Sequence, residues 1–298
     1  MRFTVYGIVV ESNYCFEYFK PCSDLLPPDI YVDVSIDSNA DIPYVRKYGD
    51  DWFEISQPNA VIYRYIDNRL DILARSDKCV KSTISSVPFF MSVYRKGGVL
   101  LHASCVMSKV SKKAAIIAAP SGVGKSTIAD FLSIKYKDVF EFVSDDAAAV
   151  YMCNKIPYVY NGPSFSKADA VGADLIGLVG CEEKNIDNNK FLINRKCNLS
   201  KINSTDELKI EAGALFFAVS IPASEKILTK EADYRSAEAF IKASIVSNRY
   251  NLSKLNNFSI AEVGLICSKI KTYILYYPQK KESLNDQLYE AIHEKILR

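Results

Sequence analysis

The chain has 298 residues, and 49% of them are hydrophobic, so it is long enough for one large domain or two modest ones with a substantial core. Lysine and arginine number 37 against 35 acidic residues, which gives a net charge of +2, and no long basic run indicates a nucleic-acid surface. No apolar stretch approaches the ~20 residues of a membrane-spanning helix.

The first segment of the chain is rich in β-branched and aromatic residues. Runs at 3–6, 30–36 and 60–66 predict strands, which proline and Asp/Asn clusters separate. Residues 1–10 predict a first strand rather than a signal peptide, because polar residues interrupt the apolar stretch. We expect residues 1–78 to form a small antiparallel β domain with no chemical constellation of its own.

Cysteine and histidine usage bears on metal binding and on the redox compartment. The eight cysteines form no Cys-x-x-Cys pair, and the chain has two histidines, His102 and His293. Zinc-binding spacing is therefore absent, and scattered free thiols are typical of a reducing cytosol. Together with the lack of a signal peptide, this pattern predicts a cytoplasmic protein.

A helix and two strands are predicted next along the chain. Residues 79–96 favour a helix that ends before a pair of glycines, and residues 99–107 favour a strand. A polar turn at 108–113 leads into a short apolar run, 114–118, which predicts a buried strand. The two strands and the turn between them indicate a hairpin.

The hairpin has a geometric consequence for His102. If its six-residue turn is symmetric, the numbers of paired residues sum to 221, so Met107 faces Ala114. In the same register His102 faces Ala119, at the point where the second strand ends. We therefore expect His102 to lie beside the segment that follows that strand.

That segment, from Ala119 to Thr127, reads Ala-Pro-Ser-Gly-Val-Gly-Lys-Ser-Thr, a phosphate-binding loop of Walker type with alanine as its first residue. Its glycines allow a tight turn that directs N–H groups at phosphate oxygens, and the helix that follows adds partial positive charge. The alternative is a glycine turn before an ordinary helix. The predicted nucleotide-binding residues are Ser121, Gly122, Val123, Gly124, Lys125, Ser126 and Thr127.

Two acidic residues follow the next short apolar run, 140–143. They are Asp145 and Asp146, and one crossover separates them from Lys125, which predicts that the two strands are neighbours. Ligands in open α/β sheets bind outside the carboxyl ends of strands, so both acids are expected near the phosphates. The alternative is a pair of acids that merely sit in a turn or cap it.

These residue types suit phosphoryl transfer, in which positioning and charge neutralisation dominate. Lys125 is expected to reach the β- and γ-phosphates, while Ser126 and Asp145 offer the oxygen ligands that Mg²⁺ prefers. We assign to Asp146 the orientation of an acceptor hydroxyl and the removal of its proton. His102 is a candidate for tuning one of the carboxylates by hydrogen bonding, and a buried structural histidine is the alternative.

The remainder of the chain alternates between strand and helix patterns, which argues for an α/β core. Before that alternation, residues 154–209 show no regular pattern and form a candidate region for covering substrate or nucleotide. Strands are expected at 214–221 and 273–277, helices at 236–247 and 260–270, and a last helix after a capping box of Ser283 and Asp286.

Several of these features together resemble one known family, the C-terminal catalytic domain of HPr kinase/phosphorylase, which belongs to the phosphoenolpyruvate-carboxykinase-like P-loop proteins. The resemblance runs from about residue 98 to residue 151. The residues that carry it are Leu101-His102 before the hairpin, Ser121-Gly-Val-Gly-Lys-Ser126 in the loop, and Ser144-Asp145-Asp146 after the next strand.

The resemblance implies a fold and a set of roles. The implied fold is α/β, a P-loop kinase core with a mixed sheet over residues 79–298, preceded by the β-rich residues 1–78. The implied cofactors are ATP and Mg²⁺. The catalytic roles of the family fall on His102, Lys125 and Asp146, and its magnesium-binding serine corresponds to Ser126.

The sequence also departs from the family. The later Glu-Arg-Gly segment, which supplies a magnesium-binding glutamate, has no match, and a later catalytic arginine has only loose candidates in Arg195, Arg235 and Arg249. These departures count against HPr as the substrate and against phosphorylase activity. The layout is similar to a divergent branch that includes kinases of natural-product precursor peptides.

The sequence thus predicts an ATP-dependent kinase that acts on a serine hydroxyl of a peptide or small protein. Two alternatives are a kinase for a small molecule, such as free serine or a sugar, and a non-catalytic nucleotide-binding module. Decarboxylation is disfavoured, because a full carboxykinase usually needs a second metal site with lysine and histidine ligands. Beyond His102, only His293 remains as a histidine for such a site. No nucleic-acid or membrane partner is expected, and association into homo-oligomers stays open.

Overall fold

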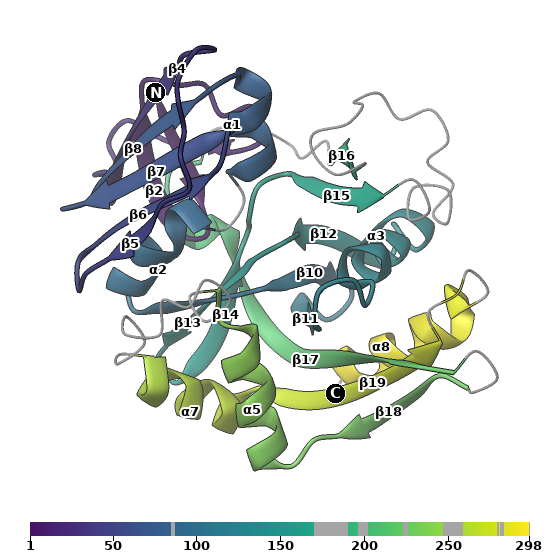
Figure 1. The fold of residues 1–298 in the computed structure, drawn as a ribbon. Helices are drawn as coiled ribbons and strands as arrows, with labels where there is room; N and C mark the ends of the chain where they lie inside the picture. Colours follow the sequence, from purple (N-terminus) through teal and green to yellow (C-terminus); the bar gives the residue numbers. More distant parts are fainter. Residues whose placement is uncertain are drawn as a thin grey trace.

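Two large sheets organise the chain, an eight-stranded sheet that contains the N-terminus and a nine-stranded sheet built from later residues (Figure 1). None of the described helices is both long and apolar enough to cross a membrane. The computed structural model describes residues 1–84, 87–169, 190–195, 202–222, 226–246, 259–278, 280 and 283–297.

The N-terminal sheet has the strand order β3-β1-β2-β4-β8-β7-β6-β5. It is mixed, because β2 and β8 both run parallel to β4, so the expected antiparallel arrangement is wrong. The strands are β1 (Arg2–Val5), β2 (Ile8–Ser12), β3 (Lys20–Pro21), β4 (Ile30–Ile36), β5 (Arg46–Tyr48), β6 (Trp52–Gln57), β7 (Val61–Ile66) and β8 (Arg69–Ala74).

The strands predicted at 3–6, 30–36 and 60–66 are present as β1, β4 and β7. The first ten residues, however, form a hairpin rather than one strand. Tyr6 and Gly7 both have positive φ, 55° and 75°, which turns the chain between β1 and β2. The polar interruption at this point marks the turn.

Helical segments connect the two sheets. The predicted helix at 79–96 is divided into α1 (Asp77–Thr83), a 3-10 turn (Val87–Phe89) and α2 (Phe90–Arg95). Side chains of all three pack into the core of the N-terminal sheet, and that core also includes Ala149 and Tyr151 of the second sheet. The two sheets therefore share buried apolar surface, and the division at residue 78 stays a prediction.

The second sheet has the order β12-β10-β11-β17-β14-β13-β9, with β19 paired to β17 and β18 paired to β19. It is mixed, as predicted, because β17 runs parallel to β11 and β19 but antiparallel to β14. The strands are β9 (Gly98–Leu101), β10 (Ala103–Ser108), β11 (Lys113–Ala118), β12 (Phe140–Ser144), β13 (Ala148–Cys153), β14 (Ile156–Tyr160), β17 (Lys209–Ile221), β18 (Leu228–Glu231) and β19 (Lys271–Pro278).

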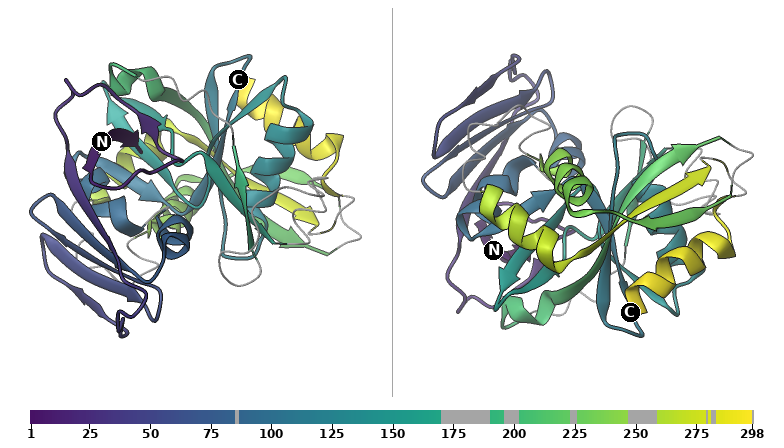
Figure 2. Two further views of the ribbon diagram at one scale, coloured as in Figure 1. Left: turned by 90° about the horizontal axis from the view of Figure 1, so that it is seen from above. Right: turned by 90° about the horizontal axis from the view of Figure 1, so that it is seen from below.

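Helices cover both faces of this sheet, and the two views of Figure 2 show them on opposite sides. On one face lie α3 (Lys125–Lys135) and α8 (Asp286–Leu297), and on the other lie α5 (Tyr234–Ser244) and α7 (Ser259–Lys269). Ile117 of β11 packs with the first pair and Ile116 with the second. Burial on both faces explains why this strand is a continuous apolar run.

Two later regions differ from the predictions made from the sequence. The segment 154–209, expected to be irregular, contains β14, an antiparallel pair of β15 (Phe165–Asp169) and β16 (Lys190–Asn194), and a 3-10 turn (Thr205–Leu208). In the last helix the cap is Asn285, whose Oδ1 accepts hydrogen bonds from the backbone N–H groups of Gln287 and Leu288, rather than Ser283.

The predicted hairpin has the expected register, since Met107 pairs with Ala114 and Ala103 with Ala118. The prediction that the strands before and after the glycine loop are neighbours is wrong, because β10 lies between β11 and β12. Both of those strands are antiparallel to β10, so their carboxyl ends still reach the same edge of the sheet. The start of β10 therefore lies between the ends of β11 and β12, and the predicted site residues follow or precede these strand ends.

Candidate functional site

The glycine loop connects β11 to α3 and has the backbone shape that its sequence predicts. Gly122 and Gly124 have φ of 83° and 102°, values in the left-handed region that other residues rarely adopt. Gly124 is the N-cap of α3, and its carbonyl accepts the first helical hydrogen bond from Ile128 at 2.9 Å. A Cβ at Gly122 would meet no atom within 4 Å, so the loop is open to an anion at that point.

Tyr277, at the end of β19, fixes the loop from the side. Its hydroxyl donates a hydrogen bond to the carbonyl of Val123, and a Cβ at Gly124 would collide with the same hydroxyl. Burial raises the pKa of Tyr277 to about 12, so the phenol remains a hydrogen-bond donor near neutral pH. Tyr277 belongs to no recognised sequence motif, because its role depends on the pairing of β19 with β17.

Lys125 begins α3 and is buried. Its ammonium donates hydrogen bonds to the carbonyls of Ala119 and Pro120, at 3.1 and 3.4 Å. A positive charge at a helix N-terminus opposes the helix dipole, and an anion in the loop would relieve this. Ser126 and Thr127 are half-buried in the first turn of the same helix. The loop, its lysine and its helix therefore fit a phosphate.

His102 and the acid pair lie opposite each other where two long strands are both interrupted. The predicted strand at 99–107 breaks at His102 into β9 and β10, and the partner strand breaks at 145–147 into β12 and β13. Pairing resumes on either side, with Leu101 opposite Ala148 and Cys105 opposite Ser144. The interruption frees polar side chains from the sheet at this level.

Asp146 is held by contacts to its backbone as well as its carboxylate. Its φ of 65° is left-handed, which is uncommon for a residue other than glycine and more tolerable for aspartate than for bulky residues. Nδ1 of His102 lies 3.0 Å from the Asp146 carbonyl oxygen and 3.6 Å from its Oδ1. The backbone N–H of His102 donates to the carbonyl of Ser244 at 2.6 Å, which fixes the histidine.

Asp145 is buried and both its oxygens accept hydrogen bonds. Ser104 donates its hydroxyl to Oδ1 at 2.6 Å, and the backbone N–H of Lys167 donates to Oδ2 at 2.9 Å. Hydroxyl and carboxylate oxygens are the donors that Mg²⁺ prefers, so Ser126 and Asp145 fit that ion in chemical type. In the described part of the chain, no three His, Cys, Asp or Glu side chains gather closely enough to hold a metal.

Lys167 of β15 is a site residue that the sequence reasoning missed. Its Nζ lies 3.5 Å from Oδ2 of Asp146, and the side chains of both are largely buried. It stands in the segment that the sequence describes as irregular, outside any recognised motif. Only the folding of β15 against the acid pair reveals it.

A buried ion pair lies behind the glycine loop. Asp130 of α3 accepts a hydrogen bond from Arg195, whose Nε donates to the hydroxyl of Ser166 at 3.2 Å. Burial raises the pKa of Asp130 to about 7, and the guanidinium of Arg195 opposes that rise. Arg195, one of three arginine candidates, is thus engaged with α3.

The other sequence candidates lie away from this edge or beyond the described residues. Arg235 is exposed on α5, and Arg249 lies outside the described ranges. The ring of His293 stacks on Tyr289 with 5.1 Å between centroids and meets Phe140 edge-on at 5.8 Å. His293 is therefore a packing residue of α8.

The N-terminal sheet reaches the acid pair through its first turn. Tyr6 is buried, its N–H donates to the carbonyl of Asn161 at 2.8 Å, and its own carbonyl accepts from the hydroxyl of Tyr151 at 2.8 Å. Burial raises the pKa of its phenol, and the carboxylates of Asp146 and Asp145 raise it further. The N-terminal segment therefore adds an uncharged phenol near the two acids.

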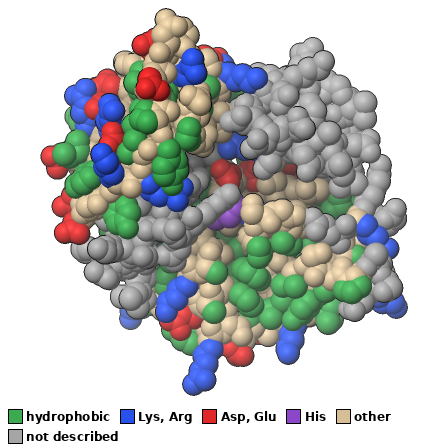
Figure 3. Space-filling view, in the orientation of Figure 1, with side chains coloured by type: hydrophobic (Ala, Val, Ile, Leu, Met, Phe, Trp, Pro, Cys, Tyr) green, Lys and Arg blue, Asp and Glu red, His purple; other side chains and the backbone are tan. Residues whose placement is uncertain are grey.

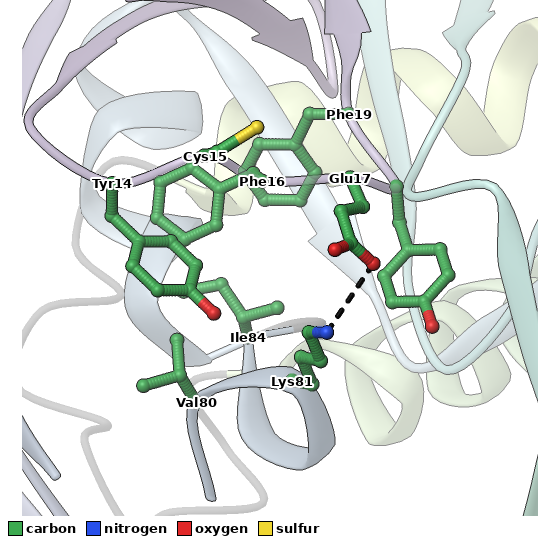
Figure 4. A pocket seen from close by; sticks show the side chains of 9 residues that line it. Tyr14, Cys15, Phe16, Glu17, Phe19, Val80, Lys81 and Ile84 are labelled. Atoms are coloured by element: carbon green, nitrogen blue, oxygen red, sulfur yellow. Dashed lines mark hydrogen bonds and ion pairs between the residues drawn. The ribbon is translucent and has the colours of Figure 1, made fainter. Parts of the chain in front are cut away.

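Acidic and histidine side chains come to the surface together in a depression near the middle of the face shown in Figure 3. A separate shallow pocket lies between α1 and residues 14–19, and Figure 4 shows its aromatic and aliphatic lining. Lys81 and Glu17 form an ion pair of 3.3 Å across it. That pocket contains none of the residues predicted to bind nucleotide.

Comparison with known proteins finds structural similarity at low sequence identity. No family model matches the chain, and no curated protein matches it. The HPr(Ser) kinase/phosphatase from Coxiella burnetii is similar over 65% of this chain and 95% of its own, with a TM-score of 0.33 and 13% sequence identity. A TM-score of this size establishes neither a common activity nor a common site, so the family resemblance of the sequence stays a prediction.

Proposed function

We propose that the chain is an ATP-dependent phosphotransferase that delivers the γ-phosphoryl group to a serine hydroxyl of a peptide or small protein, such as a natural-product precursor peptide. The observation that carries the proposal is the gathering of three sequence features at one edge of the sheet. These are the glycine loop after β11, His102 before β10 and the acid pair after β12.

The binding part of the mechanism falls to the loop and its lysine. The Lys125 ammonium, now bonded to two loop carbonyls, would exchange them for phosphate oxygens when ATP enters. Loop N–H groups and the α3 N-terminus would hold the remaining charge. Mg²⁺ held by Ser126 and Asp145 would supply charge neutralisation between the phosphates.

The acid–base part falls to Asp146. As the serine oxygen forms its bond to the γ-phosphorus, the bond from that phosphorus to the β–γ bridging oxygen breaks and ADP leaves. The serine proton passes to the Asp146 carboxylate, whose backbone His102 holds. Proton removal can follow phosphoryl transfer, so a carboxylate is a sufficient base, and such help contributes about 10²–10⁴-fold.

Transfer from γ-labelled ATP to candidate peptides tests the proposal, with intact mass confirming a gain of about 80 Da per phosphoryl group. We expect Lys125→Met to lower transfer by at least about 10²-fold and Asp146→Asn to do so with nucleotide binding retained. Consumption of ATP with label on a small molecule alone would instead favour a metabolite kinase. Wild-type protein that labels nothing and consumes no ATP would contradict both.

A non-catalytic nucleotide-binding module is the second candidate, and a specific observation favours it. Lys125 is bonded to its own loop, and both oxygens of Asp145 already accept hydrogen bonds. Such a module would bind the non-hydrolysable analogue AMP-PNP without turning over ATP. Asp146→Asn would then change no rate.

A further inference from the structure

Elements from different parts of the chain meet at the side chain of Arg195, which follows β16. Its guanidinium donates a hydrogen bond to Oδ1 of Asp130 on α3, and its Nε donates to the hydroxyl of Ser166 on β15 at 3.2 Å. The central carbon of the guanidinium also lies 5.3 Å from the centre of the Phe142 ring on β12. Arg195 therefore connects the helix of the glycine loop to the β15–β16 pair.

These contacts are shielded from water. The side chain of Arg195 is 12% exposed, and Asp130 and Ser166 are fully buried. A guanidinium carries its donors in a rigid planar fork, so it can bind a carboxylate and a hydroxyl at the same time in a defined geometry. Breaking such a contact is costly, because a buried polar group that loses its partner is not rehydrated. The distance between α3 and β15 is therefore fixed at Arg195.

β15 continues from this contact to the acid pair. The residue after Ser166 is Lys167, whose backbone N–H donates to Oδ2 of Asp145 at 2.9 Å. Adjacent residues of a strand move together, because the peptide group between them is planar. At its other end, α3 begins at Lys125 in the glycine loop. The contacts of Arg195 thus link the segment expected to hold a triphosphate to the carboxylate expected to bind Mg²⁺.

We propose that Arg195 is a positioning residue, which holds β15 against α3 so that the Lys167 N–H keeps the Asp145 carboxylate in one orientation. The consequence for Mg²⁺-dependent nucleotide binding rests on the proposed function. The hold on β15 does not, because it is a property of the chain without ligand. The alternative is a buried ion pair that stabilises the whole fold and has no particular effect on β15.

The two contacts of Arg195 can be removed separately. Ser166→Ala removes the acceptor on β15 and leaves the ion pair with Asp130 in place. Arg195→Met removes the donors of both contacts, and Arg195→Lys keeps a positive charge for Asp130 but lacks the planar fork. Ser164→Ala is the matched control on the same segment, because Ser164 meets Arg195 through its backbone carbonyl, which accepts from the Arg195 N–H at 2.9 Å.

The first measurement is amide hydrogen exchange by NMR in the ligand-free, full-length chain. Ser166→Ala should raise the exchange rate of the Lys167 amide by about tenfold or more relative to amides of β11, because β15 then opens locally. Arg195→Met and Arg195→Lys should have at least this effect, and Ser164→Ala should stay within about threefold of wild type. Normalisation to β11 removes any change in global stability. If Arg195→Met does not fold, Ser166→Ala carries the test, since it deletes a single oxygen.

The second measurement is AMP-PNP affinity by calorimetry, once with Mg²⁺ and once with EDTA. Ser166→Ala should lower the affinity measured with Mg²⁺ by about tenfold, because the support of a metal ligand is lost. The affinity with EDTA should stay within about twofold of wild type, because the glycine loop and Lys125 are unaltered. A general loss of structure would lower both affinities together. Ser164→Ala should change neither.

The two measurements separate this proposal from the proposed function. If exchange of the Lys167 amide in Ser166→Ala changes only as much as that of β11, the positioning role is overturned, whatever the nucleotide does. Faster local exchange in a protein that binds no AMP-PNP under either condition would support the hold on β15 and contradict the proposed function. Equal affinities of wild type and Ser166→Ala with Mg²⁺, or an equal loss with Mg²⁺ and with EDTA, would count against positioning of Asp145.

Discussion

The two sheets of this protein differ in how deeply their most buried charged side chains lie. On the N-terminal sheet the ion pairs lie on the solvent side, and in the Arg69–Asp33 pair the two side chains are 59% and 43% exposed. Around the second sheet, Asp130, Asp145 and Lys125 are 0%, 2% and 7% exposed. Among the residues that the structure describes, charged side chains are therefore fully buried only in the half that also contains the glycine loop.

The difference matters because buried charge is expensive. An isolated ion loses several kcal/mol of hydration, so it is retained only with partners, and exposed pairs contribute little. Both oxygens of Asp145 accept hydrogen bonds, Asp130 meets Arg195, and Lys125 meets two carbonyls. The second half thus maintains a preorganised set of charges, as a site for an anionic substrate requires.

The largest expected effect comes from removing one partner of the buried pair. Asp130→Ala leaves the guanidinium of Arg195 without its carboxylate, which should cost about 3–5 kcal/mol in the free energy of unfolding. Urea unfolding followed by circular dichroism measures it. A loss below 1 kcal/mol would mean that water solvates the guanidinium of Arg195. The two halves would then differ less in the burial of their charges.

Gly124→Ala should have the next largest effect. It forces a side chain into left-handed backbone and against the Tyr277 hydroxyl, at a cost of about 1–3 kcal/mol. AMP-PNP affinity should fall with it. In a Tyr277→Phe background the loss should be smaller, because the hydroxyl is gone, and an equal loss in both backgrounds would assign the effect to φ alone.

The pH dependence of stability should also report the raised pKa of Asp130. Its folded pKa of about 7 lies above the ordinary value of ~3.9, so the folded chain binds more protons than the unfolded chain between those values. The contribution of this group to stability is therefore lost as pH rises from about 4 to about 7, at no more than ~1.4 kcal/mol per pH unit. Urea midpoints of wild type should fall relative to Asp130→Asn over this range and run parallel above it.

The smallest effect is expected on the N-terminal sheet. Asp33→Asn removes the partner of Arg69 on the exposed face, where Arg69 also pairs with Asp71 at 3.0 Å. The urea midpoint should not move measurably at physiological salt, because solvent screens such pairs. A clear destabilisation would show that this face is less open to water than its exposure indicates.

Local sequence was sufficient wherever a short segment has its own geometric requirement. The loop glycines have the positive φ that their motif requires, and the six-residue turn set the pairing of Met107 with Ala114. The order of acids after an apolar run placed Asp145 and Asp146 at a strand end. The strands at 3–6, 30–36 and 60–66 were predicted for the same reason, although the parallel pairings of the N-terminal sheet were not.

Tertiary structure decided how these segments meet and what supports them. The insertion of β10 between β11 and β12, the seat of Lys167 against both acids, and the pairing of Asp130 with Arg195 join residues far apart in the chain. No local pattern encodes such contacts, because the secondary-structure propensity of a lysine or an arginine does not depend on the partner that its side chain meets in the folded chain. Periodicity and turn chemistry fix short segments of backbone, whereas the partner of a buried charge is chosen only when distant segments pack and exclude water.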